Sequence, residues 1–180
     1  MSDKIAMMGF GNLTLFPILE NTRDNYQVDA GFRLPWVQEM TRDNDTTQSK
    51  IYGDDTVYLD MKKWNGMTAS ITVAEMPLET FARLGFGEYD DGTETLLWNP
   101  QGRNLQFAAT FRCLRADGKY RMMKMFCFTV NEVKESALKT KGEGGDIASF
   151  KISGTFTVRM LDSLPGEIHD GADLEWLETV

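Results

Sequence analysis

The sequence has few of the residues that most catalytic and metal sites need. Its 180 residues include one histidine, His169, and two cysteines, Cys113 and Cys127. One histidine cannot build a histidine-rich zinc or iron site, and two cysteines make no disulfide framework. The shortage argues against catalysis and favours folding in a reducing compartment. We therefore expect no enzyme, no cofactor and no metal site.

Long hydrophobic runs are also missing. No apolar stretch approaches the roughly 20 residues that a membrane helix needs, and the N-terminal residues lack the apolar core of a signal peptide. Hydrophobic residues still make up 42% of the chain, which is too many for a disordered protein with a net charge of −8. The length suits one domain with a sizeable core. We expect a single domain made in the cytoplasm, without membrane contact.

Complete glycine-rich phosphate loops are absent as well. Residues 9–11 and 85–87, both GFG, lack the third glycine of a dinucleotide loop. Residues 142–145, GEGG, lack the Lys-Ser/Thr of a phosphate loop. We interpret all three segments as turns.

Charge is unevenly distributed along the chain. Residues 162–180 hold six of the 27 acidic residues and none of the 19 basic ones, so the rest of the chain is nearly balanced. A protein that grips DNA needs positive surface where it meets phosphates, and neither part provides a positive excess. Smaller clusters, acidic in 75–94 and basic in 103–124, suit either a solvated surface or complementary edges in self-association.

This charge pattern suggests a division of the chain. We expect a β domain in residues 1–161 and an acidic C-terminal extension in residues 162–180. The extension interleaves apolar residues with its acids, so whether it packs on the domain is left open.

Period-2 alternation predicts strands. In residues 150–161, apolar side chains such as Ile152 and Phe156 alternate with polar ones, and residues 67–73 alternate in the same way. Gly154 interrupts the apolar face and indicates a bend or a close backbone approach. A hairpin is expected around Asp117 and Gly118, because Asp-Gly accepts the positive φ angles of a two-residue turn.

That turn would fix the pairing of the two hairpin strands. Opposed residue numbers would add to 235, so that one face is almost wholly apolar. The expected pairs are Phe107 with Phe128, Ala109 with Phe126, Phe111 with Lys124 and Cys113 with Met122. The reverse face, with Met123 and Met125, suits an oligomer interface, a lumen or a solvated surface. The two cysteines would lie roughly 16 Å apart along the strands, too far for a disulfide.

One helix and two long loops complete the pattern. Residues 77–85 predict a short helix that begins with Pro77 and must pack against the sheet. Residues 41–50, TRDNDTTQSK, and 136–149, SALKTKGEGGDIAS, lack periodicity and are expected to be loops, either disordered or in contact with a partner. The fold class is therefore mainly β, a single-domain β-sandwich or open barrel with one short packed α-helix and long loops.

Five short motifs follow one another in a fixed order. They are 9–13 (GFGNL), 51–58 (IYGDDTVY), 76–86 (MPLETFARLGF), 111–120 (FRCLRADGKY) and 139–143 (KTKGE). Their order and spacing resemble the major tail protein (tail tube protein) family of long-tailed bacteriophages, over about residues 9–161. The acidic extension after residue 161 is not part of the shared pattern.

The resemblance implies a structural virion protein. In that family, subunits join into hexameric rings, and the rings stack into a tail tube that conducts DNA during ejection. The implied partners are further copies of the chain and other tail proteins such as the tape measure, tail terminator and distal tail protein. DNA is only a non-specific passenger in the lumen. The implied location is the virion tail, after synthesis in the cytoplasm of the bacterial host.

The resemblance also implies where subunits or rings touch. The candidate contact residues are Arg42, Asp43, Asp45, Tyr52, Asp54, Asp55, Lys139, Lys141, Glu143 and Asp146. Three alternatives stay open, and the third is a virion protein that caps or joins the tube without forming it. The first is an inner tube protein of a contractile injection system, which the family also resembles. The second is a monomeric small-molecule-binding β-barrel, because eleven methionines and eleven phenylalanines suit an adaptable apolar cavity.

Overall fold

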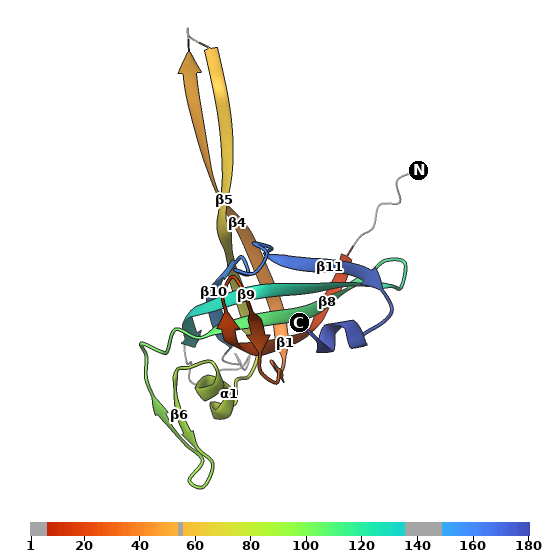
Figure 1. Ribbon diagram of the computed structural model, residues 1–180. Helices are drawn as coiled ribbons and strands as arrows, with labels where there is room; N and C mark the ends of the chain where they lie inside the picture. The colour runs from red at the N-terminus through yellow and green to blue at the C-terminus, as the bar shows by residue number, and fades with distance from the viewer. Residues whose placement is uncertain (1–6, 54–55, 136–148) are drawn as a thin grey trace, which may run out of the picture.

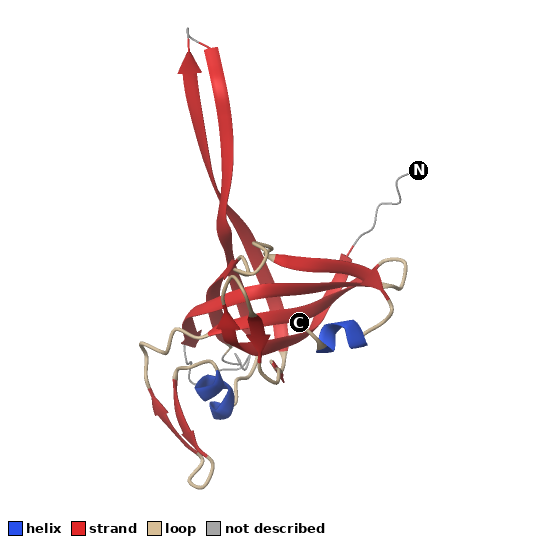
Figure 2. Cartoon of the chain, in the orientation of Figure 1, coloured by secondary structure: helices blue, strands red, loops and turns tan. Residues whose placement is uncertain are grey.

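The computed structural model describes residues 7–53, 56–135 and 149–180, and in these ranges the chain is mainly β (Figures 1 and 2). The strands are β1 (Met7–Asn21), β2 (Tyr26–Val28), β3 (Phe32–Arg33), β4 (Val37–Gly53), β5 (Thr56–Val73), β6 (Gly87–Asp90), β7 (Thr95–Trp98), β8 (Gln106–Arg115), β9 (Tyr120–Glu135), β10 (Phe150–Thr157) and β11 (Gly166–Gly171). The helices are α1 (Leu78–Arg83) and the short 3-10 helix η1 (Glu175–Glu178). The predicted mainly β class is confirmed.

Nine of the described strands form one antiparallel sheet. Its order is β2-β1-β8-β9-β10-β5-β4, with β3 paired to β1 and β11 paired to β9, while β6 and β7 form a separate hairpin. The sheet is strongly curled. Three strands separate β4 from β8 in the sheet, yet the guanidinium of Arg42 on β4 lies 5.2 Å from the ring centre of Phe111 on β8. The described strands thus make an open, curled sheet and no closed barrel.

The core lies inside this curl. Phe107, Phe111, Phe128 and Phe156 are fully buried there, and the rings of Phe128 and Phe156 lie 4.5 Å apart between centroids. The short helix α1 packs at one end of the core, where Phe81 meets the ring of Phe150 edge-on at 5.4 Å. The prediction of a short helix packed on the sheet is confirmed.

The helix boundaries follow from proline and glycine. Pro77 has φ −57° and ψ 145°, so it flanks the helix and α1 begins one residue later than predicted. Gly85 takes a φ of +92°, which ends the helix in a left-handed conformation. This glycine does form a turn, as predicted for residues 85–87.

The predicted pairing of β8 with β9 is right far from the turn and wrong near it. Phe107 faces Phe128 as expected. The pairs nearer the turn are Ala109 with Met125, Phe111 with Met123 and Cys113 with Arg121, instead of those expected. Met123 and Met125 consequently lie in the core and not on a reverse, mixed face.

The turn itself explains this shift. Only Gly118 has a positive φ, +80°, and its N–H donates to the carbonyl of Arg115 at 3.0 Å. The N–H of Arg115 donates to the carbonyl of Lys119 at 2.8 Å, so the loop has three residues and not two. A β-bulge between Phe107 and Ala109 then restores the expected pairing. Cys113 and Cys127 are free, as predicted.

Three further expectations fail. Residues 41–50 form the middle of β4, where they pair with β5, and are not a loop. All ten residues are polar, so this segment lacks the alternation of apolar residues that would predict a strand. Residues 9–11 are no turn but lie within β1, where bulges accommodate Gly9 at φ +73°. The last core strand ends at Thr157 and not at residue 161. Residues 142–145 lie outside the described residues.

The acidic extension packs on the sheet. Strand β11 pairs with β9 from Gly166 opposite Met125 to Gly171 opposite Tyr120, and Leu177 in η1 is buried. The question left open from the sequence is therefore answered for the described residues of this segment. The division into two units at residue 161 stays a prediction.

Candidate functional site

Strands β4 and β5 leave the sheet together and project far beyond it (Figure 1). Strand β10 accompanies β5 only as far as the pair Phe156 and Met67. Beyond that pair, the described residues of 45–66 form a hairpin of two strands alone, which we call the arm. Eight residue steps separate the pair Asp45 and Gly66 from the pair Gly53 and Thr56 along β4, so the arm is roughly 27 Å long.

The arm has two unlike faces. Opposed residues share a face, and one face carries the pairs Ile51 with Leu59, Ser49 with Met61 and Thr47 with Lys63. The other carries Lys50 with Asp60, Gln48 with Lys62 and Thr46 with Trp64. The first face is apolar toward the tip, and its side chains Ile51, Leu59 and Met61 are 48%, 41% and 50% exposed. We call these three residues the arm stripe.

Side-chain hydrogen bonds fix the base of the arm. The indole N–H of Trp64 donates to Asn44 Oδ1 at 3.2 Å, and Asn65 Nδ2 donates to Thr47 Oγ1 at 2.6 Å. A β-bulge lies here, between Asp45 and Thr46, and such a bulge bends a strand and increases its twist. Next to it, a Cβ on Gly66 would lie 3.1 Å from the carbonyl oxygen of Phe156. The arm thus leaves the sheet at a defined point.

The predicted contact residues are distributed unevenly around this arm. Asp43 is exposed beside its base, and Asp45 and Tyr52 are exposed on it, Tyr52 by 66%. Arg42 is half-buried and points into the curl, where its Nη1 lies 3.5 Å from Met123 Sδ. The other predicted contacts lie outside the described residues: Asp54, Asp55, Lys139, Lys141, Glu143 and Asp146. All ten assignments stay predictions.

Sequence reasoning missed the arm stripe. Ile51 belongs to the family motif 51–58, whereas Leu59 and Met61 lie outside every motif. Leu59, Met61 and Lys63 alternate with Asp60 and Lys62, which is a weak period-2 signal. An extension of the strand predicted for 67–73 toward the N-terminus would have found both residues.

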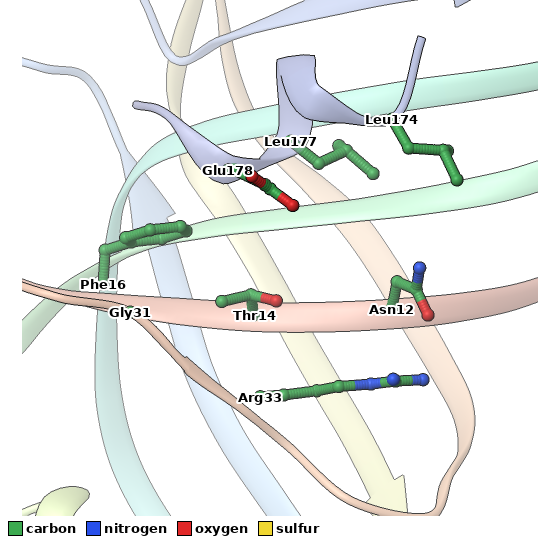
Figure 3. A pocket seen from close by; sticks show the side chains of 8 residues that line it. All are labelled: Asn12, Thr14, Phe16, Gly31, Arg33, Leu174, Leu177 and Glu178. Atoms are coloured by element: carbon green, nitrogen blue, oxygen red, sulfur yellow. The ribbon is translucent and has the colours of Figure 1, made fainter. Parts of the chain in front are cut away.

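A hollow of about 430 Å³ lies outside the sheet, between β1 and the C-terminal segment. Figure 3 shows Asn12, Thr14 and Phe16 on one side and Leu174, Leu177 and Glu178 on the other. Its lining mixes charged, polar and apolar side chains. The interior of the curl, where a small-molecule carrier would hold its ligand, is instead packed with phenylalanine and methionine side chains.

Ion pairs fasten the C-terminal segment to the sheet beside this hollow. Asp170 accepts from Arg121 at 2.7 Å and pairs with Arg115 at 2.8 Å. The hydrogen bond from Arg121, with the nearby charge of Arg115, lowers the pKa of Asp170. Burial lowers the pKa of Lys124, whose ammonium lies 4.2 Å from the ring centre of Trp176. These contacts hold β11 beside β9 within the sheet, on the edge opposite β8, and hold η1 against the outer face of the sheet.

Within the described residues, no group of three or more His, Cys, Asp or Glu side chains is placed to hold a metal ion. No helix in the described ranges is long and apolar enough to span a membrane. The expected absence of catalysis stays a prediction.

Solved structures include chains that are similar to this one. No protein-family model and no curated protein matches the sequence. Among solved structures, the chain is similar to a chain of the six-fold symmetrised cryo-EM structure of the anti-feeding prophage (AFP) baseplate. The TM-score is 0.39 at 8% sequence identity, and the match covers 94% of this chain and 99% of the other.

Proposed function

We propose that this chain is the repeating subunit of a phage-like tail tube, in which copies join into rings and the rings stack. The observation that carries the proposal is the arm. A two-stranded ribbon is only marginally stable alone in water, and an uncovered apolar stripe marks an interaction site. A structure that keeps such an arm extended needs a partner to cover it, and another copy of the chain supplies one.

The edges of the sheet support lateral joining. In the described part of the chain, β4 is the last strand of the sheet on one side and β2 on the other. Unpaired strand edges invite pairing with another chain, and merging sheets between subunits uses them without uncontrolled growth. A closed ring needs two such unlike edges, because each subunit must meet its neighbours head-to-tail.

The charge distribution suits a passage for DNA. Outside residues 162–180 the chain carries 19 basic and 21 acidic residues, so that part lacks the positive excess with which a protein grips phosphates. A duplex can slide past such a wall without being held. On this proposal the protein works in the tail of a virion or phage-like particle, together with the other proteins of the tail.

Assembly of the purified protein tests the proposal. We expect concentrated wild-type protein to form rings or tubes with a central channel, seen by negative-stain electron microscopy and by light scattering after size exclusion. A strict monomer at every concentration would reject the proposal.

An arm-shortened variant tests the observation that carries it. Replacement of residues 46–65 by an Asn-Gly turn joins the paired residues Asp45 and Gly66 and leaves the pairs of β5 with β10 in place, so the sheet should remain folded. We expect this variant to be soluble and to unfold cooperatively in urea, but to form no stacked tubes. If this variant forms normal tubes, the arm is not needed for tube assembly.

A further inference from the structure

The outer side of the sheet is polar where β4, β5 and β10 lie next to one another. Opposed residues share a face, and two rows of such residues cross these three strands. The alternate residues Ala69, Ile71 and Ile152 point into the core, so both rows lie on the outer side. We call the six residues of these rows the hydroxyl face: Thr41, Ser70 and Ser153 in one row, and Asp43, Thr68 and Thr155 in the next.

The hydroxyl face carries no large apolar side chain. The large hydrophobic side chains that the described residues expose all lie elsewhere, for example Ile51 on the arm, Leu97 on β7 and Ile168 on β11. Contacts between subunits have apolar centres, so a face without apolar side chains is suited to stay in water after assembly. In a tube, two surfaces stay in water, and these are the outside and the wall of the channel.

The charges on and beside the hydroxyl face nearly balance. Asp43 lies on the face, and the adjacent row adds Glu39 on β4 and Lys151 on β10. On the neighbouring strand β9, the carboxylate of Glu132 pairs with the ammonium of Lys134 at 3.0 Å. Three acidic and two basic side chains give this surface no positive excess with which to hold phosphates.

Another part of the outer side is covered and acidic. Over β9, Lys124 is buried beneath the ring of Trp176 in η1. Residues 162–180, which include η1, hold six acidic residues and no basic one. A channel wall made of this segment would repel phosphates and oppose the entry of DNA, whereas the hydroxyl face would neither hold nor repel them. The edge strand β4 carries part of the hydroxyl face, so pairing at that edge continues the face from one subunit to the next.

We propose that the hydroxyl face lines the channel of the tube and is the surface past which duplex DNA slides. The proposal rests on the proposed function and assigns the wall of its channel. Hydroxyl groups both donate and accept hydrogen bonds, so they keep this wall hydrated. The covered side of the sheet, with η1, then faces away from the channel.

A gold label locates the hydroxyl face in the assembled tube. Thr68→Cys places a thiol on this face, and Glu175→Cys on η1 is the matched control, since both positions are exposed in the subunit. Wild-type protein gives the background, which should be low because burial raises the pKa of the Cys113 and Cys127 thiols. Subunits labelled with a maleimide gold cluster are assembled with an excess of unlabelled wild type and imaged by cryo-electron microscopy. We expect gold from Thr68→Cys inside the channel and gold from Glu175→Cys outside it.

Added positive charge tests the same face by its effect on DNA. Thr68→Lys with Ser153→Lys should give a wall that holds phosphates, and Thr68→Gln with Ser153→Gln is the uncharged control. Each variant is assembled together with wild type and short duplex DNA at low salt, and nuclease then digests the DNA bound outside the tubes. We expect the lysine tubes to protect at least about tenfold more DNA than the glutamine tubes.

The outcomes separate this inference from the proposed function. Gold from Thr68→Cys inside the channel, together with the excess of protected DNA, supports the hydroxyl face as the channel wall. Gold outside the tube, exclusion of the labelled Thr68→Cys subunit from tubes, or equal protection of DNA by lysine and glutamine tubes would overturn the inference and leave the tube proposal standing. Failure of the wild-type protein to form rings or tubes would overturn both.

Discussion

Strands β4 and β5 each have one half in the sheet and one half in the arm, and the halves differ in what covers them. In the sheet, Ile71 on β5 is fully buried and Ala69 and Val73 are nearly so. In the arm, Ile51 on β4 and Leu59 on β5 face each other across the same ladder, yet both are at least 41% exposed. The backbone pairing is continuous, while the burial is not.

This difference shows that regular pairing alone does not account for the arm. Each half has an apolar face, but in the sheet that face meets the core, and in the arm nothing among the described residues covers it. Burial of apolar surface is the main stabilising term in folding, so the exposed half gains it only on association. The same two strands therefore serve the fold at one end and, on our proposal, assembly at the other.

The largest expected effect compares one isoleucine from each half. Ile71→Ala removes a fully buried side chain from the core and should lower the free energy of unfolding by about 2–5 kcal/mol. Ile51→Ala should change it by less than about 0.5 kcal/mol, because the side chain is already half exposed. Urea unfolding, measured below the concentration at which tubes form, gives both values. Equal costs at the two positions would show that the arm is covered within the subunit.

The sequence predicted the sheet half of this comparison better than the arm half. Alternation in 67–73 and 150–157 marks strands because one of their faces is buried in the core. Residues 41–50 are polar on nearly every position, so their pairing with β5 left no pattern to find. The length of the arm depends on pairing between distant strands, which composition does not encode.

The same limit applies to the candidate site. The family resemblance directed attention to Tyr52 and Asp45, which the structure places on the arm. It did not predict the arm stripe, since this depends on the register of β4 with β5. The turn at Gly118 was located correctly, but its type was not. Asp-Gly suits both a two-residue turn and a three-residue loop.

A smaller effect is expected where the arm leaves the sheet. In Gly66→Ala the new Cβ would lie 3.1 Å from the carbonyl oxygen of Phe156, so β5 or β10 must shift. We expect a loss of about 1–2 kcal/mol in the free energy of unfolding. Gly11→Ala is the control, because a Cβ on Gly11 meets nothing within 4 Å, and it should change stability by less than about 0.5 kcal/mol. Equal stability of Gly66→Ala and wild type would mean that the junction is free to move.

The smallest effect concerns a charge that holds a segment on the sheet, compared with a charge on the arm. Arg121 and Arg115 lower the pKa of Asp170, so this carboxylate stabilises the folded chain above its unfolded-state pKa of about 4. Its contribution is lost as the pH falls through the lowered, folded-state pKa. Asp170→Asn should therefore have a lower urea midpoint than wild type near neutral pH, and the gap should close well below pH ~4. Asp60→Asn on the arm removes an exposed carboxylate that accepts hydrogen bonds from Gln48, and its midpoint should match wild type throughout. A gap for Asp170→Asn that stays constant with pH would show that the ion pairs do not fasten the C-terminal segment.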